Sequence, residues 1–130
     1  MRYIGIDFGT KRIGVAVSDA DGRMAFARTI IDSSSDVLGA LQNIIAEGST
    51  AGIVVGVPIG FSGQESDMAE QVRTFAATLE ALGLPVILEN EILTSSASRT
   101  LRPDVGHIDA GAAALMLQGF LERNERESHK

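Results

Sequence analysis

The chain has 130 residues, of which 45% are hydrophobic and 22% are charged, a composition typical of one globular domain spanning 1–130. It contains no cysteine and only two histidines, so disulfides and thiolate metal sites are excluded and a histidine-built zinc site is not expected. The net charge of −6 argues against a nucleic-acid partner, because proteins bind phosphates through basic patches.

Residues 3–19 predict two adjacent strands joined by a tight turn. Alternation along the first strand puts its large apolar side chains on one face and Asp7 on the other, between Gly5 and Gly9. We expect this second face to be open around Asp7, because glycine on both sides indicates close approach by a ligand. A ligand for a cation or phosphate is therefore our first interpretation of Asp7. An aspartate that accepts hydrogen bonds from the following turn is the alternative.

The rest of the chain predicts further strands and helices in alternation. The run from Asp19 to Gly22 indicates a hairpin turn rather than a calcium loop. We expect strands over about 24–30, 53–58 and 85–88, and helices over about 37–47, 68–82, 94–101 and 110–121. Residues 122–130 are predicted to be a solvated tail. This order indicates a five-stranded mixed sheet, an antiparallel meander extended by parallel crossovers and flanked by helices.

Four acidic residues lie at the ends of these predicted elements: Asp7, Glu89, Glu91 and Asp109. The two glutamates follow the last strand, where a polar loop explains them equally well. Asp109 opens the last helix, where an acid can simply cap it. If three of these carboxylates converge, they repel one another and are stable only with protons or cations among them. Acids that hold Mg²⁺ or Mn²⁺ have the chemistry that phosphodiester hydrolysis needs.

The opening residues 5–19 resemble the start of the YqgF/RuvX family of ribonuclease H-like nucleases. Residues 55–58, 91–95 and 109–118 resemble its later blocks, in the same order. Members of the family are described as Holliday junction resolvases and as nucleases that process the end of the small-subunit (16S) rRNA precursor. The resemblance implies an α/β, ribonuclease H-like fold and a two-metal nuclease. It also implies nucleic acid as the partner, with RNA favoured over DNA, together with ribosomal precursor particles.

The resemblance assigns Asp7, Glu91 and Asp109 as catalytic acids that bind Mg²⁺ or Mn²⁺, and it leaves Glu89 without a role. The candidate substrate-binding residues are Thr10, Lys11 and Arg12, which follow Asp7. Two divalent ions would offset the negative charge of the chain. Lys11 and Arg12 could then form a phosphate-facing strip with two further basic residues, Arg23 and Arg28.

The N-terminal sequence lacks the features of a signal peptide, and no apolar run is long enough to cross a membrane. We therefore expect a cytoplasmic protein with no membrane partner, and we include a homodimer among its expected assemblies.

The chain departs from the family pattern near the third block. Asn90 and Ile92 stand where the family usually has Asp and Arg, and the segment between Glu91 and Asp109 is shorter and less basic than usual. These losses favour an alternative, a ribosome- or transcription-associated binding module without catalysis. A second alternative comes from residues 7–10, which resemble the first phosphate loop of actin-like ATPases. Those proteins need two such domains.

Overall fold

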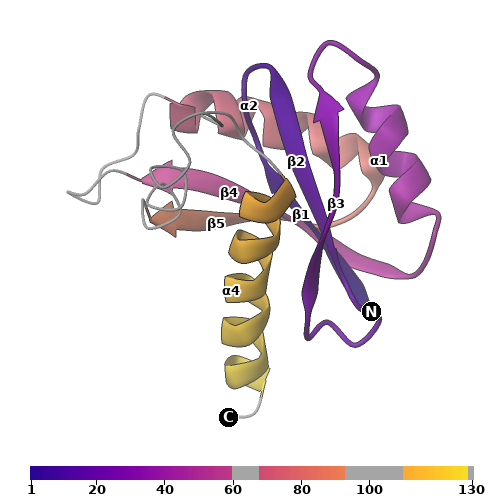
Figure 1. Cartoon of the computed structure of the whole chain (residues 1–130), viewed down its shortest axis with the longest axis vertical. Coiled ribbons are helices and arrows are strands. Elements are labelled where there is room, and N and C mark those ends of the chain that lie inside the picture. Colours follow the sequence, from indigo (N-terminus) through magenta and orange to yellow (C-terminus); the bar gives the residue numbers. More distant parts are fainter. Residues whose placement is uncertain (60–67, 93–109, 129–130) are drawn as a thin grey trace.

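The computed structural model describes residues 1–59, 68–92 and 110–128; for residues 58, 59, 68, 91, 92 and 125–128 it describes the backbone alone. Five strands form one sheet in the order β3-β2-β1-β4-β5, with helices on both faces (Figure 1). The elements are β1 (Arg2–Asp7), β2 (Arg12–Ser18), β3 (Ala25–Asp32), α1 (Val37–Ile45), β4 (Thr50–Ile59), α2 (Met68–Leu79), the 3₁₀ turn η1 (Glu80–Leu82), β5 (Val86–Ile92) and α4 (Ala110–Ser128).

The strand directions confirm the predicted mixed sheet. β1, β2 and β3 form an antiparallel meander, whereas β4 pairs in parallel with both β1 and β5. The central strand is therefore β1, and its carboxyl end lies at the same edge of the sheet as those of β4 and β5. In sheets of this kind, ligands bind beyond the carboxyl ends of the strands.

Each face of the sheet has its own apolar core. α1 and α2 cover one face, where Ile4 and Ile6 of β1 are fully buried. α4 crosses the other face, where its buried Leu117 packs in a second core that includes Val54 of β4 (Figure 1). β4 thus contributes alternate residues to both cores, as expected of a strand that is an unbroken apolar run.

Local signals in the sequence fix several ends of these elements. The carboxylate of Asp36 accepts a hydrogen bond from the amide of Gly39 at 3.0 Å and so caps α1. Gly83, at φ +80°, ends the turn after α2, in a backbone conformation that glycine adopts readily. The carboxylate of Asp19 accepts from the amides of Arg23 and Met24 at 2.8 and 3.3 Å, which confirms the hairpin turn.

Two elements are longer than the sequence predicts. β5 continues to Ile92, so Glu89 lies within the strand instead of following it. Pairing with β4 extends β5 through this polar run, which shows sheet context outweighing local propensity. α4 continues beyond Leu121 to Ser128, because the charged residues of the expected tail are good helix formers. The helix predicted over 94–101 lies outside the described residues.

Candidate active site

Asp7 is the last residue of the central strand, and its side chain is 3% exposed. Its backbone pairs with Gly14 of β2. On the other side, Ile6 pairs with Val55, which places Gly56 of β4 next to Asp7. Both neighbours of Asp7 in this row of the sheet therefore lack side chains. A carboxylate buried here at the carboxyl end of a parallel strand is the centre of the candidate site.

The face of the sheet that carries Asp7 is covered, not open as predicted. A Cβ atom added at Gly5 would lie 2.8 Å from the Cβ of Leu117 on α4, which is closer than real side chains approach. The glycine at position 5 therefore permits close packing of a helix, and its interpretation as a mark of ligand approach is wrong. The pattern of a strand shows which residues share a face but does not show what packs against that face.

α4 runs antiparallel to β1. The ring of Phe120 lies 5.3 Å from that of Tyr3, and Leu117 lies over Gly5, nearer the carboxyl end of the strand. Each step towards the start of the helix is thus a step towards Asp7. The first turn of α4, at Ala110, therefore lies at the Asp7 end of β1.

β5 brings a second acid into the row of Asp7. Glu89 pairs with Gly56, so the row reads Gly14, Asp7, Gly56 and Glu89 across four strands. The Glu89 side chain is 18% exposed and forms an ion pair with Arg123 of α4. The strand period gives this placement once β5 is extended to Ile92, because positions 87 and 89 share a face and Ile87 packs in the core beneath α4.

The other two predicted acids are described less fully. The backbone of Glu91 pairs with that of Pro58 on β4, but its side chain is not among those described. Asp109 lies outside the described residues. Within the described part of the chain, no three Asp, Glu or His side chains lie together as a metal-binding group. The assignment of Glu91 and Asp109 to the site therefore stays a prediction.

The turn between β1 and β2 carries the predicted substrate-binding residues. Thr10, Lys11 and Arg12 are all exposed there, immediately after Asp7 and Gly9. The Ser33 hydroxyl donates to the carbonyl of Thr10 at 2.7 Å, and its amide donates to the carbonyl of Lys11 at 3.0 Å. These bonds to the end of β3 hold the turn in place while the long side chains remain in solvent.

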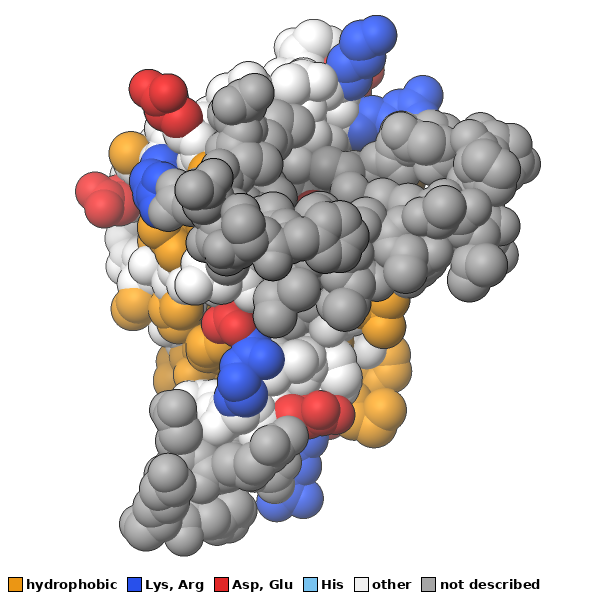
Figure 2. Space-filling model, turned by 90° about the vertical axis from the view of Figure 1, so that its left-hand side faces the viewer, with side chains coloured by type: hydrophobic (Ala, Val, Ile, Leu, Met, Phe, Trp, Pro, Cys, Tyr) orange, Lys and Arg blue, Asp and Glu red, His pale blue; other side chains and the backbone are white. Residues whose placement is uncertain are grey.

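The predicted phosphate-facing strip does not form. Arg28 is held by Glu47 at 2.6 Å, and Arg23 lies in the β2–β3 hairpin, at the opposite end of β2 from Lys11 and Arg12. Figure 2 likewise shows basic side chains scattered among acidic ones on the face that it displays. Charges close in sequence were separated because a strand carries them to opposite ends of the sheet.

Asp32, which pairs with Arg12 across the β2–β3 ladder, gives a testable pH dependence. Hydrogen bonds from the hydroxyl and amide of Ser34, with a smaller effect of Arg12, lower the pKa of Asp32 below its ordinary value of 3.8. A lowered pKa means that Asp32 stabilises the fold above pH 3.8 and that this contribution is lost as the pH falls through the lowered pKa. We expect Ser34→Ala to return the pKa of Asp32 towards 3.8 in an NMR titration. The pKa of Asp19, which is lowered chiefly by a hydrogen bond from the backbone amide of Arg23, should not change.

The fold is that of the RuvC-like resolvases, which are ribonuclease H-like. RuvC of T. thermophilus, in complex with a Holliday junction substrate, matches with a TM-score of 0.56 at 13% identity, and the match covers 96% of both chains. The Fowlpox virus resolvase, solved with Holliday junction DNA, matches with a TM-score of 0.52 at 10% identity over 95% of this chain and 98% of its own. At these identities the likeness shows the fold alone, and it confirms the fold that the resemblance implies.

The family of the chain follows from its sequence relatives. The family model RuvX, described as Holliday junction resolvase, matches residues 1–123. A protein of Oleidesulfovibrio alaskensis is 40% identical over 96% of this chain and 94% of its own length. One of Novosphingobium aromaticivorans is 40% identical over 92% and 83%. Both are named "Putative pre-16S rRNA nuclease". The chain belongs to the RuvX family, which confirms the resemblance of its opening residues.

Proposed function

We propose that this protein is a nuclease that hydrolyses phosphodiester bonds with Mg²⁺ or Mn²⁺, and that its substrate is the precursor of 16S rRNA. The observation that carries the proposal is Asp7, a buried carboxylate at the carboxyl end of the central strand in a chain of the RuvX family. The names of the curated relatives favour RNA over DNA. A Holliday junction, which is bound in the solved complexes of two structurally similar resolvases, is the alternative substrate.

In this proposal Asp7, Glu91 and Asp109 hold two divalent ions. Carboxylate oxygens are the ligands that such hard cations prefer. Glu91 is two positions beyond Glu89 on β5, and positions two apart on a strand share a face. Asp109 immediately precedes α4, whose first turn lies at the Asp7 end of β1. The three acids would thus supply the carboxylate oxygens that hold the ions beyond the carboxyl end of the central strand.

The ions, when bound, would supply a hydroxide nucleophile from water and neutralise the leaving oxygen. The chain itself supplies the positioning. Asp7 is fixed by its burial on the central strand, and the turn bearing Thr10, Lys11 and Arg12 is fixed by Ser33. This turn would bind substrate phosphates beside Asp7. Because the chain has no cysteine, a thiolate nucleophile is excluded.

The Lys11→Ala variant tests substrate binding at this turn. If Lys11 contacts one phosphate, the slope of log K against log salt concentration should become shallower by about 1. Fluorescence anisotropy with labelled RNA from 50 to 300 mM salt measures that slope. Arg23→Ala is the matched control. It removes a positive charge from the hairpin at the opposite end of β2, so it should change the slope by much less than Lys11→Ala does. Equal slopes for Lys11→Ala and the unmodified protein would show that Lys11 is a solvated surface charge that contacts no substrate phosphate.

A cleavage assay tests the function itself. The purified protein is incubated with a labelled single-stranded RNA that carries a 16S precursor end, and separately with a four-way DNA junction, in Mg²⁺, in Mn²⁺ and in chelator. Metal-dependent cleavage of the RNA supports the proposal, and cleavage of the junction alone would assign the protein to DNA resolution. Binding without cleavage would support the non-catalytic module. ATP hydrolysis without cleavage would support the actin-like alternative.

The proposal also concerns location and assembly. No helix in the described ranges is long and apolar enough to cross a membrane. A role in ribosome maturation places the protein in the cytoplasm, on ribosomal precursor particles. A four-way junction has two equivalent strands to cut, which suits a two-fold homodimer, whereas trimming one RNA end needs a single copy. Light scattering with each substrate would show which assembly accompanies cleavage.

A further inference from the structure

Glu89 is an acid that the family pattern leaves without a role, yet it shares a row with Asp7. Only the backbone of Gly56 stands between them in that row. Two strand spacings of about 4.8 Å put the Cα atoms of Glu89 and Asp7 about 10 Å apart. Both lie on the side of the sheet that faces α4, since Ile87, two residues before Glu89, packs in the α4 core. With 18% exposure, Glu89 is less screened by water than an ordinary surface charge.

Arg123 reaches Glu89 from α4. Helical side chains point back towards the helix N terminus, and the Arg123 side chain passes over Gly119, where an added Cβ would lie 3.6 Å from its Nη1 atom. The resulting ion pair joins α4 to β5. Because Arg123 is 53% exposed, the pair contributes little to the stability of the fold. The ion pair matters more for the charge near Asp7, because the guanidinium offsets the negative charge of Glu89 in the same row.

We propose that Arg123 neutralises Glu89 and thereby sets the affinity of the Asp7 site for divalent cations. This inference rests on the proposed function, because it requires a cation at Asp7. Without Arg123, an uncompensated carboxylate would add to the attraction for a divalent ion. Without Glu89, the positive charge of Arg123 would oppose that ion. The two single substitutions are therefore expected to shift the affinity for a divalent cation in opposite directions. If the ion pair were only a structural contact, both substitutions would shift it in the same direction.

Coulomb's law sets the size of these effects. If the Cα separation of about 10 Å is taken as the distance between the Glu89 charge and the ion, one unit charge in a partly solvated setting at low salt changes the dissociation constant by about three- to tenfold. In Arg123→Met we expect Mn²⁺ to bind about three- to tenfold more tightly. In Glu89→Gln we expect binding weaker by a similar factor. The double variant and the charge-retaining Arg123→Lys should both lie near the unmodified protein.

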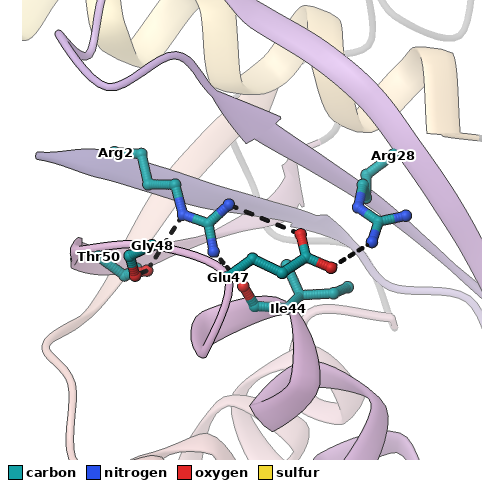
Figure 3. Close-up of polar contacts among 6 residues, drawn as sticks. All are labelled: Arg2, Arg28, Ile44, Glu47, Gly48 and Thr50. Carbon is teal, nitrogen blue, oxygen red and sulfur yellow. Dashed lines mark hydrogen bonds and ion pairs between the residues drawn. The ribbon is translucent and has the colours of Figure 1, made fainter.

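Isothermal titration of the full chain with Mn²⁺, at pH 8 and low salt, measures these four variants without substrate. The pair formed by Arg28 and Glu47 is the matched control. Glu47 follows α1 and lies between Arg2 and Arg28 on the opposite side of the sheet from α4 (Figure 3). Arg28→Met and Glu47→Gln remove the same charges at a site remote from Asp7, so both should leave the Mn²⁺ affinity unchanged.

The possible failures are distinguishable. If the unmodified protein binds no Mn²⁺ and cleaves nothing, the metal-dependent function itself is wrong. If it binds Mn²⁺ but Arg123→Met and Glu89→Gln leave the affinity unchanged, or shift it in the same direction, the role of Arg123 is overturned while the function stands. Shifts of the expected size in the Arg28 and Glu47 controls would also overturn it, since they would show an effect of net charge alone.

Discussion

Asp7→Asn is expected to lower metal-dependent cleavage by at least about a thousandfold, because it removes a carboxylate proposed to hold the divalent ions. Single-turnover cleavage under saturating protein measures the chemical step, and titration with Mn²⁺ measures the lost binding. Combination with Glu91→Gln should add little further loss, since acids that act as one unit do not give additive effects. Asparagine keeps the shape of the side chain, so the loss reports the charge.

The same variant should fold normally. Asp7 is 3% exposed, and removal of a buried charge in the absence of metal should leave the melting temperature equal or higher. Circular dichroism in chelator provides this check. A large loss of stability would instead identify Asp7 as a structural hydrogen-bonding residue, the alternative that the sequence left open. Full activity in Asp7→Asn would contradict the proposed function.

The period-two pattern of the first strand was sufficient to separate Asp7 from the apolar face of β1, because alternation is a local property of the backbone. It was not sufficient to show that Leu117 covers Gly5, since that contact joins distant parts of the chain. The sequence predicts too early an end for β5 for a similar reason, since the strand continues to Ile92. Glu89 is polar, but its pairing with Gly56 and its ion pair with Arg123 come from other elements.

Charge placement shows the same limit. The sequence suggested that Lys11 and Arg28 could share one phosphate-facing strip, but Arg28 is held by Glu47, far along the chain. Ion pairs between elements depend on the folded topology, which residue spacing within one element does not report. Of the predicted acidic triad, the structure places the Asp7 side chain, and Glu91 and Asp109 rest on the family resemblance and on the elements beside them.

Gly5→Ala is expected to lower the free energy of unfolding by about 1–3 kcal/mol, because overpacking a close contact forces the backbone to move. The new Cβ would lie 2.8 Å from the Cβ of Leu117, which is fully buried. Neither Cβ atom can rotate away, so α4 must shift relative to β1. Leu117→Ala, which keeps its own Cβ, should not relieve the clash and should itself cost about 2–5 kcal/mol through the cavity that it leaves.

Urea unfolding of the variants measures these losses, and Gly119→Ala is the control. Gly119 is also a glycine of α4, but the nearest atom to its added Cβ is the flexible end of Arg123 at 3.6 Å. Alanine should therefore be tolerated there and should favour the helix by up to about 1 kcal/mol. If Gly5→Ala is as stable as Gly119→Ala, the contact between α4 and β1 is looser than the structure shows. Because the first turn of α4 lies at the Asp7 end of β1, a tight contact predicts that Gly5→Ala also weakens Mn²⁺ binding.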